Sequence, residues 1–308
     1  MRVLFWGTPD FAVPALAALV GEGLDVVGVV TQPDKPQGRS RSSVVASPVK
    51  TLAIREEIPV LQPVKARDPG FVEEIRKLEP DISVVVAYGQ ILTKDVIDLP
   101  GLGTLNIHAS LLPALRGAAP IQGAILAGFA ETGISIMQMV PALDAGPVLH
   151  QVTTPIGPEE TYGELAMRLS ELGALAIVEA LALMSAGALE SKEQDPALVT
   201  HASKVTRDAA RIDWTRDALQ VSRGIRAFDP RPGSFTTANG EEVKLFHPSL
   251  ADGVSGNPGQ VLEAGNDLVV ACGTGAVRIC EVQPSGRRRM AVGDWTRGRA
   301  VAVGDVLG

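Results

Sequence analysis

Val3-Leu4-Phe5-Trp6-Gly7-Thr8-Pro9-Asp10-Phe11-Ala12 opens the chain with a short apolar run, a glycine turn and the beginning of a helical segment. An apolar run of this length is typical of a strand that is covered on both faces. At such a turn, dinucleotide-binding folds carry the motif G-x-G-x-x-G. Here Pro9 replaces the second glycine, and proline lacks the N–H group that a bound pyrophosphate would use. The stretch predicts a strand followed by a helix and argues against a nicotinamide enzyme; a plain turn and a ligand-contacting loop fit it equally well.

The same alternation of short β-branched runs and amphipathic segments continues through the first half of the chain. We expect strands at residues 3–6, 25–31, 81–87, 104–108 and 132–139. Helices are expected between and after them, at residues 12–22, 49–56, 70–78, 119–126 and 161–184. Strands that alternate with helices predict an α/β fold with a mostly parallel sheet.

The second half has a different composition. A polar, irregular stretch follows Gly187, and it predicts a linker over residues 188–207 between a first domain at 1–187 and a second at 208–308. The second domain begins with a helix at 218–227. Short strands rich in flanking glycine and proline follow at 242–246, 259–263, 267–271 and 276–282, so we expect a small β-barrel.

Composition excludes several classes of protein. With 45% hydrophobic and 20% charged residues in 308, the chain is not disordered. No apolar run approaches the roughly 20 residues of a membrane span, and no signal peptide precedes Gly7, so we expect a cytoplasmic protein. We also expect it to be a monomer. Two cysteines and four histidines without metal-ligand spacing give no sign of a disulfide framework or a metal site.

The charge distribution allows local contact with nucleic acid. A net charge of −7 argues against binding through bulk positive charge. Residues 208–308, however, carry as many basic as acidic side chains, and they include the run Arg287, Arg288 and Arg289. Such a run can bind phosphate, although an exposed, solvated loop is the commoner outcome.

Asn106 and His108 are the first candidates for chemistry. They stand two residues apart in a predicted strand, so their side chains lie on the same side, roughly 7 Å apart. At the carboxyl end of a parallel strand, an amide donor beside an imidazole can stabilise a developing oxyanion. A buried, hydrogen-bonded histidine with a structural asparagine is the alternative.

Asp144 is a candidate partner for His108. It lies in a turn after the strand predicted at 132–139, so it belongs to a plausible active edge of the sheet. A carboxylate there would favour the imidazolium and accept a proton when an amine attacks a carbonyl group. An Asx turn or a surface charge is the competing interpretation.

A family resemblance runs through most of the chain. The motifs that carry it, in order, are those at residues 5–12, 31–34, 47–50, 86–89, 106–108, 110–113, 116–122, 133–139, 210–214 and 225–228. In this order and spacing the chain resembles the methionyl-tRNA formyltransferase family. The resemblance implies a Rossmann-like formyltransferase domain followed by an OB-fold-like barrel that binds tRNA. It also implies transfer of formyl from 10-formyltetrahydrofolate to the α-amino group of methionine on initiator methionyl-tRNA, without a metal.

The resemblance also implies roles for particular residues. Asn106 and protonated His108 would stabilise the oxyanion, and Asp144 would tune His108 and help to move the proton. The folate would bind beside Tyr88, Gly89, Ile91, Leu92, Ser110, Leu111, Leu112 and Pro113, although core packing is an alternative role for Ile91 and Leu92. The tRNA would contact Arg39 and Arg41, in the loop after the second strand. Arg287, Arg288 and Arg289, which the charge distribution singles out, are the further candidates for tRNA contact.

The chain departs from the family pattern at three places. Ser40-Arg41-Ser42-Ser43 replaces Gly-Lys-Lys-Leu, Ala114-Leu115 replaces Arg-Trp, and Ala142 and Ala145 replace glycine and threonine beside Asp144. Three other functions remain open: a formyltransferase for a small amine such as glycinamide ribonucleotide or an amino sugar, a formyltetrahydrofolate hydrolase, and a non-catalytic RNA-binding protein. Arginines and family motifs beyond the first domain argue against the small amine, and the intact trio argues against pure RNA binding.

Overall fold

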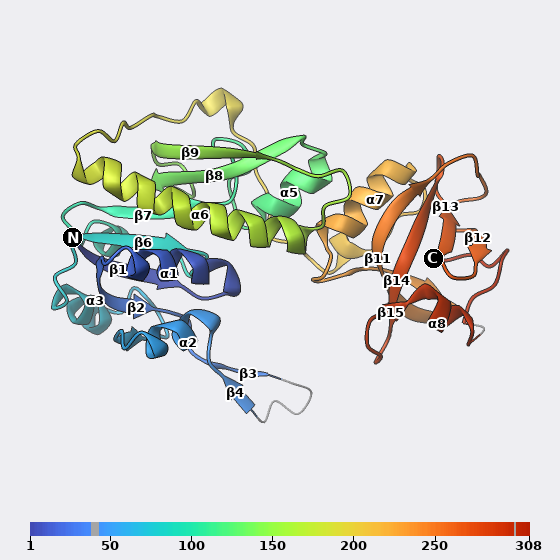
Figure 1. Cartoon of the computed structure of the whole chain (residues 1–308), viewed down its shortest axis with the longest axis horizontal. Helices are drawn as coiled ribbons and strands as arrows, with labels where there is room; N and C mark the ends of the chain where they lie inside the picture. The colour runs from blue at the N-terminus through green and yellow to red at the C-terminus, as the bar shows by residue number, and fades with distance from the viewer. Residues whose placement is uncertain (38–42, 299) are drawn as a thin grey trace. The chain divides into compact units, whose positions relative to one another are not determined.

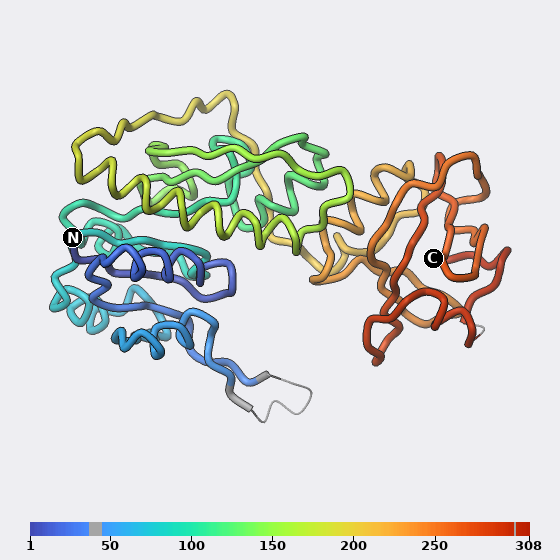
Figure 2. Tube along the Cα trace, viewed as in Figure 1, coloured from blue at the N-terminus to red at the C-terminus, as the bar shows by residue number. Residues whose placement is uncertain are grey.

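A computed structural model describes residues 1–37, 43–298 and 300–308. The chain forms two compact units, each assembled from separate stretches of sequence, whose backbones are traced in Figures 1 and 2. The first unit comprises Met1–Gly117, Thr132–Thr154 and Ala166–His201. The second comprises Ala118–Glu131, Pro155–Leu165 and Ala202–Gly308.

A seven-stranded sheet forms the centre of the first unit. Its strand order is β5-β2-β1-β6-β7-β8-β9. The bounds are β1 Arg2–Gly7, β2 Asp25–Val30, β5 Val60–Leu61, β6 Ile82–Val86, β7 Thr104–His108, β8 Glu131–Gln138 and β9 Val148–Pro155. The pairs from β5 to β7 are parallel, and β8 runs antiparallel to β7. The mostly parallel α/β sheet expected from the sequence is therefore confirmed. A separate hairpin consists of β3 Lys35–Gln37 and β4 Ser43–Val45.

Helices cover this sheet. They are α1 Val13–Gly21, α2 Pro48–Arg55, α3 Pro69–Arg76, α4 Lys94–Ile97 and α6 Tyr162–Ser185. Ser47 and Asp68 cap α2 and α3, because each side chain accepts a backbone N–H of the first turn. Thr161 and Glu164 form the capping box that the sequence predicts for α6. Gly173 lets α6 approach the sheet, since a Cβ there would lie 3.0 Å from Ile107.

The core on the α3 side of the sheet is built around Trp6. Its indole ring meets the rings of Phe71 and Tyr88 edge to face, at centroid distances of 6.0 and 5.2 Å. The indole N–H donates to the Ser83 hydroxyl at 3.2 Å, which satisfies a buried donor. This packing fixes the carboxyl ends of β1 and β6, where the next loops begin.

An antiparallel sheet forms the second unit. Its order is β10-β11-β14-β13-β12, with β15 paired to β14. The bounds are β10 Ser234–Ala238, β11 Glu241–Ala251, β12 Val261–Ala264, β13 Leu268–Ala271, β14 Ala276–Pro284 and β15 Met290–Ala291, with helices α5 Pro120–Ala127, α7 Ala218–Ala227 and α8 Val292–Thr296. Gly308 exchanges two backbone bonds with Thr237 of β10, and Val261 of β12 donates to Asp305. The last residues thus join the two edge strands, in agreement with the predicted barrel.

No helix among the described residues is long and apolar enough to cross a membrane.

Candidate active site

His108 ends β7 and is buried, with 5% of its surface exposed. Its Nε2 lies 3.0 Å from the carbonyl oxygen of Leu115. Because a carbonyl can only accept, Nε2 carries the hydrogen of this bond. The other ring nitrogen, Nδ1, lies 3.8 Å from Oδ2 of Asp144. The backbone bond thus orients the ring with Nδ1 toward a carboxylate.

Asn106 lies two residues before His108 on β7 and is half-buried. It pairs with Val85 of β6 on one side and with Met137 of β8 on the other. The strand period of two directs the side chains of Asn106 and His108 to the same side of the sheet. An amide and an imidazole therefore stand next to each other where a parallel strand ends.

Asp144 lies in the turn between β8 and β9, and it has a left-handed backbone conformation with φ +47°. Its Oδ2 accepts the backbone N–H of Gly117 at 2.7 Å. The turn also needs glycine at position 146, because a Cβ there would lie 1.8 Å from the carbonyl oxygen of Gln138. The turn holds one carboxylate close to His108 and to the backbone N–H of Gly117, in the loop that follows β7.

Burial divides the eight residues predicted to contact a folate. Four have buried side chains, namely Tyr88, Leu92, Ser110 and Leu112. The other four are exposed or half-buried, namely Gly89, Ile91, Leu111 and Pro113, and Ile91 has 88% of its surface exposed. Burial raises the pKa of Tyr88 to about 12, and its hydroxyl has no hydrogen-bond partner among the described residues. Four of the predicted residues are therefore packed inside the protein, and the other four keep accessible surface.

Hydrogen bonds fix the loop at residues 110–114. Ser110 Oγ donates to the carbonyl oxygen of Ala114 at 2.6 Å, and Ser135 Oγ donates to that of Ser110 at 2.6 Å. The backbone N–H of Leu112 donates to Ser135 Oγ at 3.0 Å, and Gln151 donates to the Leu112 carbonyl at the same distance. The sequence assigns no role to Ser135, although it lies in the motif at 133–139, or to Gln151; both hold the loop next to His108.

A polar network lies at the base of the β3–β4 hairpin. Lys50 Nζ donates to Asp34 Oδ2 at 2.5 Å and to Gln62 Oε1 at 2.7 Å. Hydrogen bonds from Lys50 and Gln62 hold the pKa of the Asp34 carboxyl below its ordinary value. Gln32 extends the network by donating to the Tyr88 carbonyl at 3.2 Å. Arg39 and Arg41, the tRNA contacts predicted for this hairpin, lie outside the described residues.

The three arginines at positions 287–289 differ in their contacts. Arg287 and Arg288 are exposed at the tip of the hairpin between β14 and β15. Arg289 is instead engaged: it binds the buried carboxylate of Asp229 through two nitrogens, at 2.7 and 3.1 Å, and it also bonds Glu281. These carboxylates raise the pKa of its guanidinium. Two arginines are therefore available for a ligand, and the third stabilises the hairpin.

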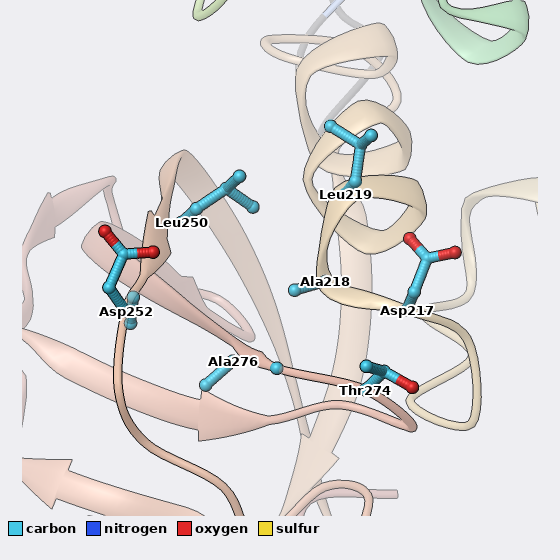
Figure 3. A pocket seen from close by; sticks show the side chains of 9 residues that line it. Asp217, Ala218, Leu219, Leu250, Asp252, Thr274 and Ala276 are labelled. Carbon is cyan, nitrogen blue, oxygen red and sulfur yellow. The ribbon is translucent and has the colours of Figure 1, made fainter.

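The second unit also has a pocket of about 350 Å³, which Figure 3 shows from close by. Its lining includes two titratable residues, Asp217 and Asp252, and Asp217 already caps α7. None of the predicted site residues that the structure describes lines this pocket. Across the described part of the chain, no group of three or more His, Cys, Asp or Glu side chains could hold a metal ion.

Comparison with known proteins adds further findings. A family model for formyl transferases matches residues 1–181, and one for the formyl transferase C-terminal domain matches residues 204–300. The chain is 48% identical to the methionyl-tRNA formyltransferase of Stutzerimonas stutzeri, across 100% of this chain and 98% of that protein. It is 44% identical to the methionyl-tRNA formyltransferase of Geobacter sulfurreducens, across 100% and 97%. A solved N-formyltransferase from Helicobacter canadensis, in complex with folinic acid and dTDP-3-aminofucose, superposes with a TM-score of 0.71 at 17% identity, across 92% of this chain and 99% of that one. At that identity the likeness shows the fold.

Proposed function

Because this chain belongs to the methionyl-tRNA formyltransferase family and is a formyltransferase that acts on methionyl-tRNA, we propose that Asn106, His108 and Asp144 catalyse the transfer. The proposed donor is 10-formyltetrahydrofolate, and the proposed acceptor is the α-amino group of methionine on initiator tRNA. The observation that carries this proposal is the 3.8 Å approach of His108 Nδ1 to the Asp144 carboxylate, at the edge of the sheet that also bears Asn106.

In the proposed reaction, the amine nitrogen attacks the formyl carbon and forms a new C–N bond. The carbonyl oxygen gains negative charge, and the Asn106 amide and the His108 imidazolium stabilise it. The tetrahedral intermediate then collapses, the bond between the formyl carbon and N10 breaks, and N10 leaves with a proton. Asp144 receives the proton from the amine, through water, and passes it toward N10.

Hydrogen-bond geometry supports different tasks for the two nitrogens of His108. Nε2–H donates to the Leu115 carbonyl at 3.0 Å. Nδ1 is therefore the nitrogen that would donate to the oxyanion. Asp144, held by the Gly117 N–H, would stabilise the protonated ring without needing to move.

We place the folate against the accessible residues Gly89, Ile91, Leu111 and Pro113. Ile91 is exposed, and Gly89, two residues before it, has φ +90°. This loop offers accessible apolar surface that suits a pterin ring. The buried residues Tyr88, Leu92, Ser110 and Leu112 would act indirectly, by holding this surface in place. Their direct contacts with the folate would come from the backbone.

For the tRNA we propose two groups of arginines. Arg287 and Arg288 are exposed and can bind phosphate, whereas Arg289 is assigned a supporting role because carboxylates occupy its guanidinium. Arg39 and Arg41 complete the proposal from the sequence. The Lys50–Asp34 pair supports it by bracing the base of their hairpin.

Single-turnover transfer of labelled formyl tests the proposed substrates. Enzyme in excess is mixed with 10-formyltetrahydrofolate and one acceptor: initiator methionyl-tRNA, elongator methionyl-tRNA, free methionine or glycinamide ribonucleotide. The proposal predicts fast transfer to the initiator tRNA only. Transfer to a small amine alone would contradict the acceptor, and formate release without an acceptor would indicate a hydrolase.

A further inference from the structure

Residues 192–201, which the sequence predicts to be part of a linker, lie along the loops of the candidate active site; we call them the strap. Lys192 and Val148 exchange backbone hydrogen bonds in both directions at 2.8 Å. Near the other end of the strap, Arg116 N donates to the Thr200 carbonyl at 2.9 Å. The strap is therefore attached to two loops, the one that follows Asp144 and the one that contains Arg116.

Gln194 connects these two loops through its side chain. Its Nε2 donates to the carbonyl oxygen of Asp144 at 2.9 Å and to that of Gly146 at 2.7 Å. Its Oε1 accepts from Nε and Nη2 of Arg116, at 3.0 and 2.8 Å. Both amide hydrogens and the amide oxygen are thus used, and Gln194 is half-buried between exposed neighbours.

The loops that Gln194 joins contain unfavourable backbone conformations. Asp144 has φ +47° and Leu115 has φ +60°, in the left-handed region that costs a non-glycine residue about 1 kcal/mol or more. Each has a partner in the strap: Gln194 binds the Asp144 carbonyl, and Thr200 Oγ1 accepts the Leu115 N–H at 2.9 Å. Asp144 and Leu115 are also the residues that lie against the two ring nitrogens of His108.

From this arrangement we infer that Gln194 is a positioning residue for the transfer reaction: it holds the Asp144 turn against the Arg116–Gly117 loop, and so sets the carboxylate relative to His108. The inference rests on the proposed role of Asp144. Glutamine suits the task because it donates two hydrogen bonds while accepting two. A glutamate there would keep the contact with Arg116 but would set a carboxylate against two carbonyl oxygens.

Gln194→Met tests the inference, because it keeps the length of the side chain and removes every polar contact. We expect kcat to fall about tenfold to a hundredfold, as small misplacements of catalytic groups do, while KM for folate and for tRNA stay within about twofold. Gln194→Glu should lower kcat as well. Glu193→Ala, at the exposed neighbouring position, is the matched control and should keep wild-type kinetics.

A double-mutant cycle with Asp144→Asn distinguishes positioning from general stability. If Gln194 acts through Asp144, then Gln194→Met should cost little further activity in the Asp144→Asn background. A full additional loss there, or a single variant with kcat within about twofold of wild type, would overturn the inference.

Hydrogen exchange provides a readout besides activity. Residues 140–148 should exchange faster in Gln194→Met than in the wild type or in Glu193→Ala. Unchanged exchange in this segment would also overturn the inference. If the wild-type enzyme transferred no formyl group at all, the proposed function would fail, and the exchange data would still report whether Gln194 orders the turn.

Discussion

Replacing the Asp144 carboxylate by an amide, as Asp144→Asn, perturbs the site with little change in shape. The new amide can still accept the Gly117 N–H, now 2.7 Å from Oδ2, so the turn should keep its form. The negative charge 3.8 Å from His108 Nδ1 is lost. At an effective dielectric constant of about 20, the carboxylate and a protonated ring at this distance attract by about 4 kcal/mol, which limits the electrostatic part of the loss of rate to about a thousandfold. Loss of the proton acceptor contributes separately.

The assay is single-turnover formyl transfer to initiator methionyl-tRNA, with folate and tRNA affinities measured separately. We expect the rate of the chemical step to fall by about two to three orders of magnitude, while both affinities and the melting temperature change little. Asp68→Asn is the control, because Asp68 also accepts backbone N–H groups but caps α3. Near-normal turnover in Asp144→Asn, or an equal loss in Asp68→Asn, would refute this mechanism.

The exposed arginines, the buried cysteine and the cap of α6 each allow a further prediction. Replacing Arg287 and Arg288 together by alanine should weaken tRNA binding. The slope of log binding constant against log salt concentration should become less steep by about 1 for each phosphate that these arginines neutralise. An unchanged slope would remove this hairpin from the tRNA site. Cys272 should resist iodoacetamide at pH 8 until the protein unfolds, because burial raises its pKa to about 11 and keeps it a thiol. Mass spectrometry of the folded protein should find label only on Cys280, which is exposed. Equal labelling of both cysteines would contradict the fold. Hydrogen bonds from Thr161 lower the pKa of Glu164 from its ordinary value of 4.5, so their stabilisation is complete above that value and is lost as pH falls. Thr161→Ala removes the hydroxyl bonds but keeps the backbone N–H bond to Glu164. It should lower the unfolding free energy by about 1 kcal/mol at pH 7 and by somewhat less near pH 3, where the hydroxyl no longer meets a carboxylate, as measured by denaturant titration; an equal loss at both pH values would contradict this linkage.

Local sequence patterns predicted the parts of the fold that depend on local physics. The nearly continuous run of isoleucine and valine predicted β6, the alternating apolar residues of Thr104–His108 predicted β7, and the period of two predicted that Asn106 and His108 share a side. Thr161 and Glu164 predicted the start of α6, because a capping box needs only the four residues that form it. β9 was missed: it lies at the edge of the sheet, and its half-exposed residues give a weaker apolar signal.

Contacts between distant residues escaped prediction. Gln194 donates a hydrogen bond to the carbonyl oxygen of Asp144, which lies fifty residues earlier in the sequence. The polar stretch around Gln194 is typical of a linker. Likewise, the run of arginines does not reveal that Arg289 pairs with Asp229, sixty residues earlier. In both cases, tertiary packing supplies a polar partner that composition and spacing alone do not identify.

The central claim is that folate-dependent transfer takes place where His108 meets Asp144, and NMR of the protein with 15N-labelled histidine tests it most directly. Only four histidines contribute signals, and His108→Gln assigns the relevant one. We predict that Nε2 of His108 carries a hydrogen in the unbound enzyme, and that saturating tetrahydrofolate shifts the ring nitrogens of His108 more than those of His150, which lies against Glu179. Folate binding that leaves the His108 signals unchanged would contradict the claim.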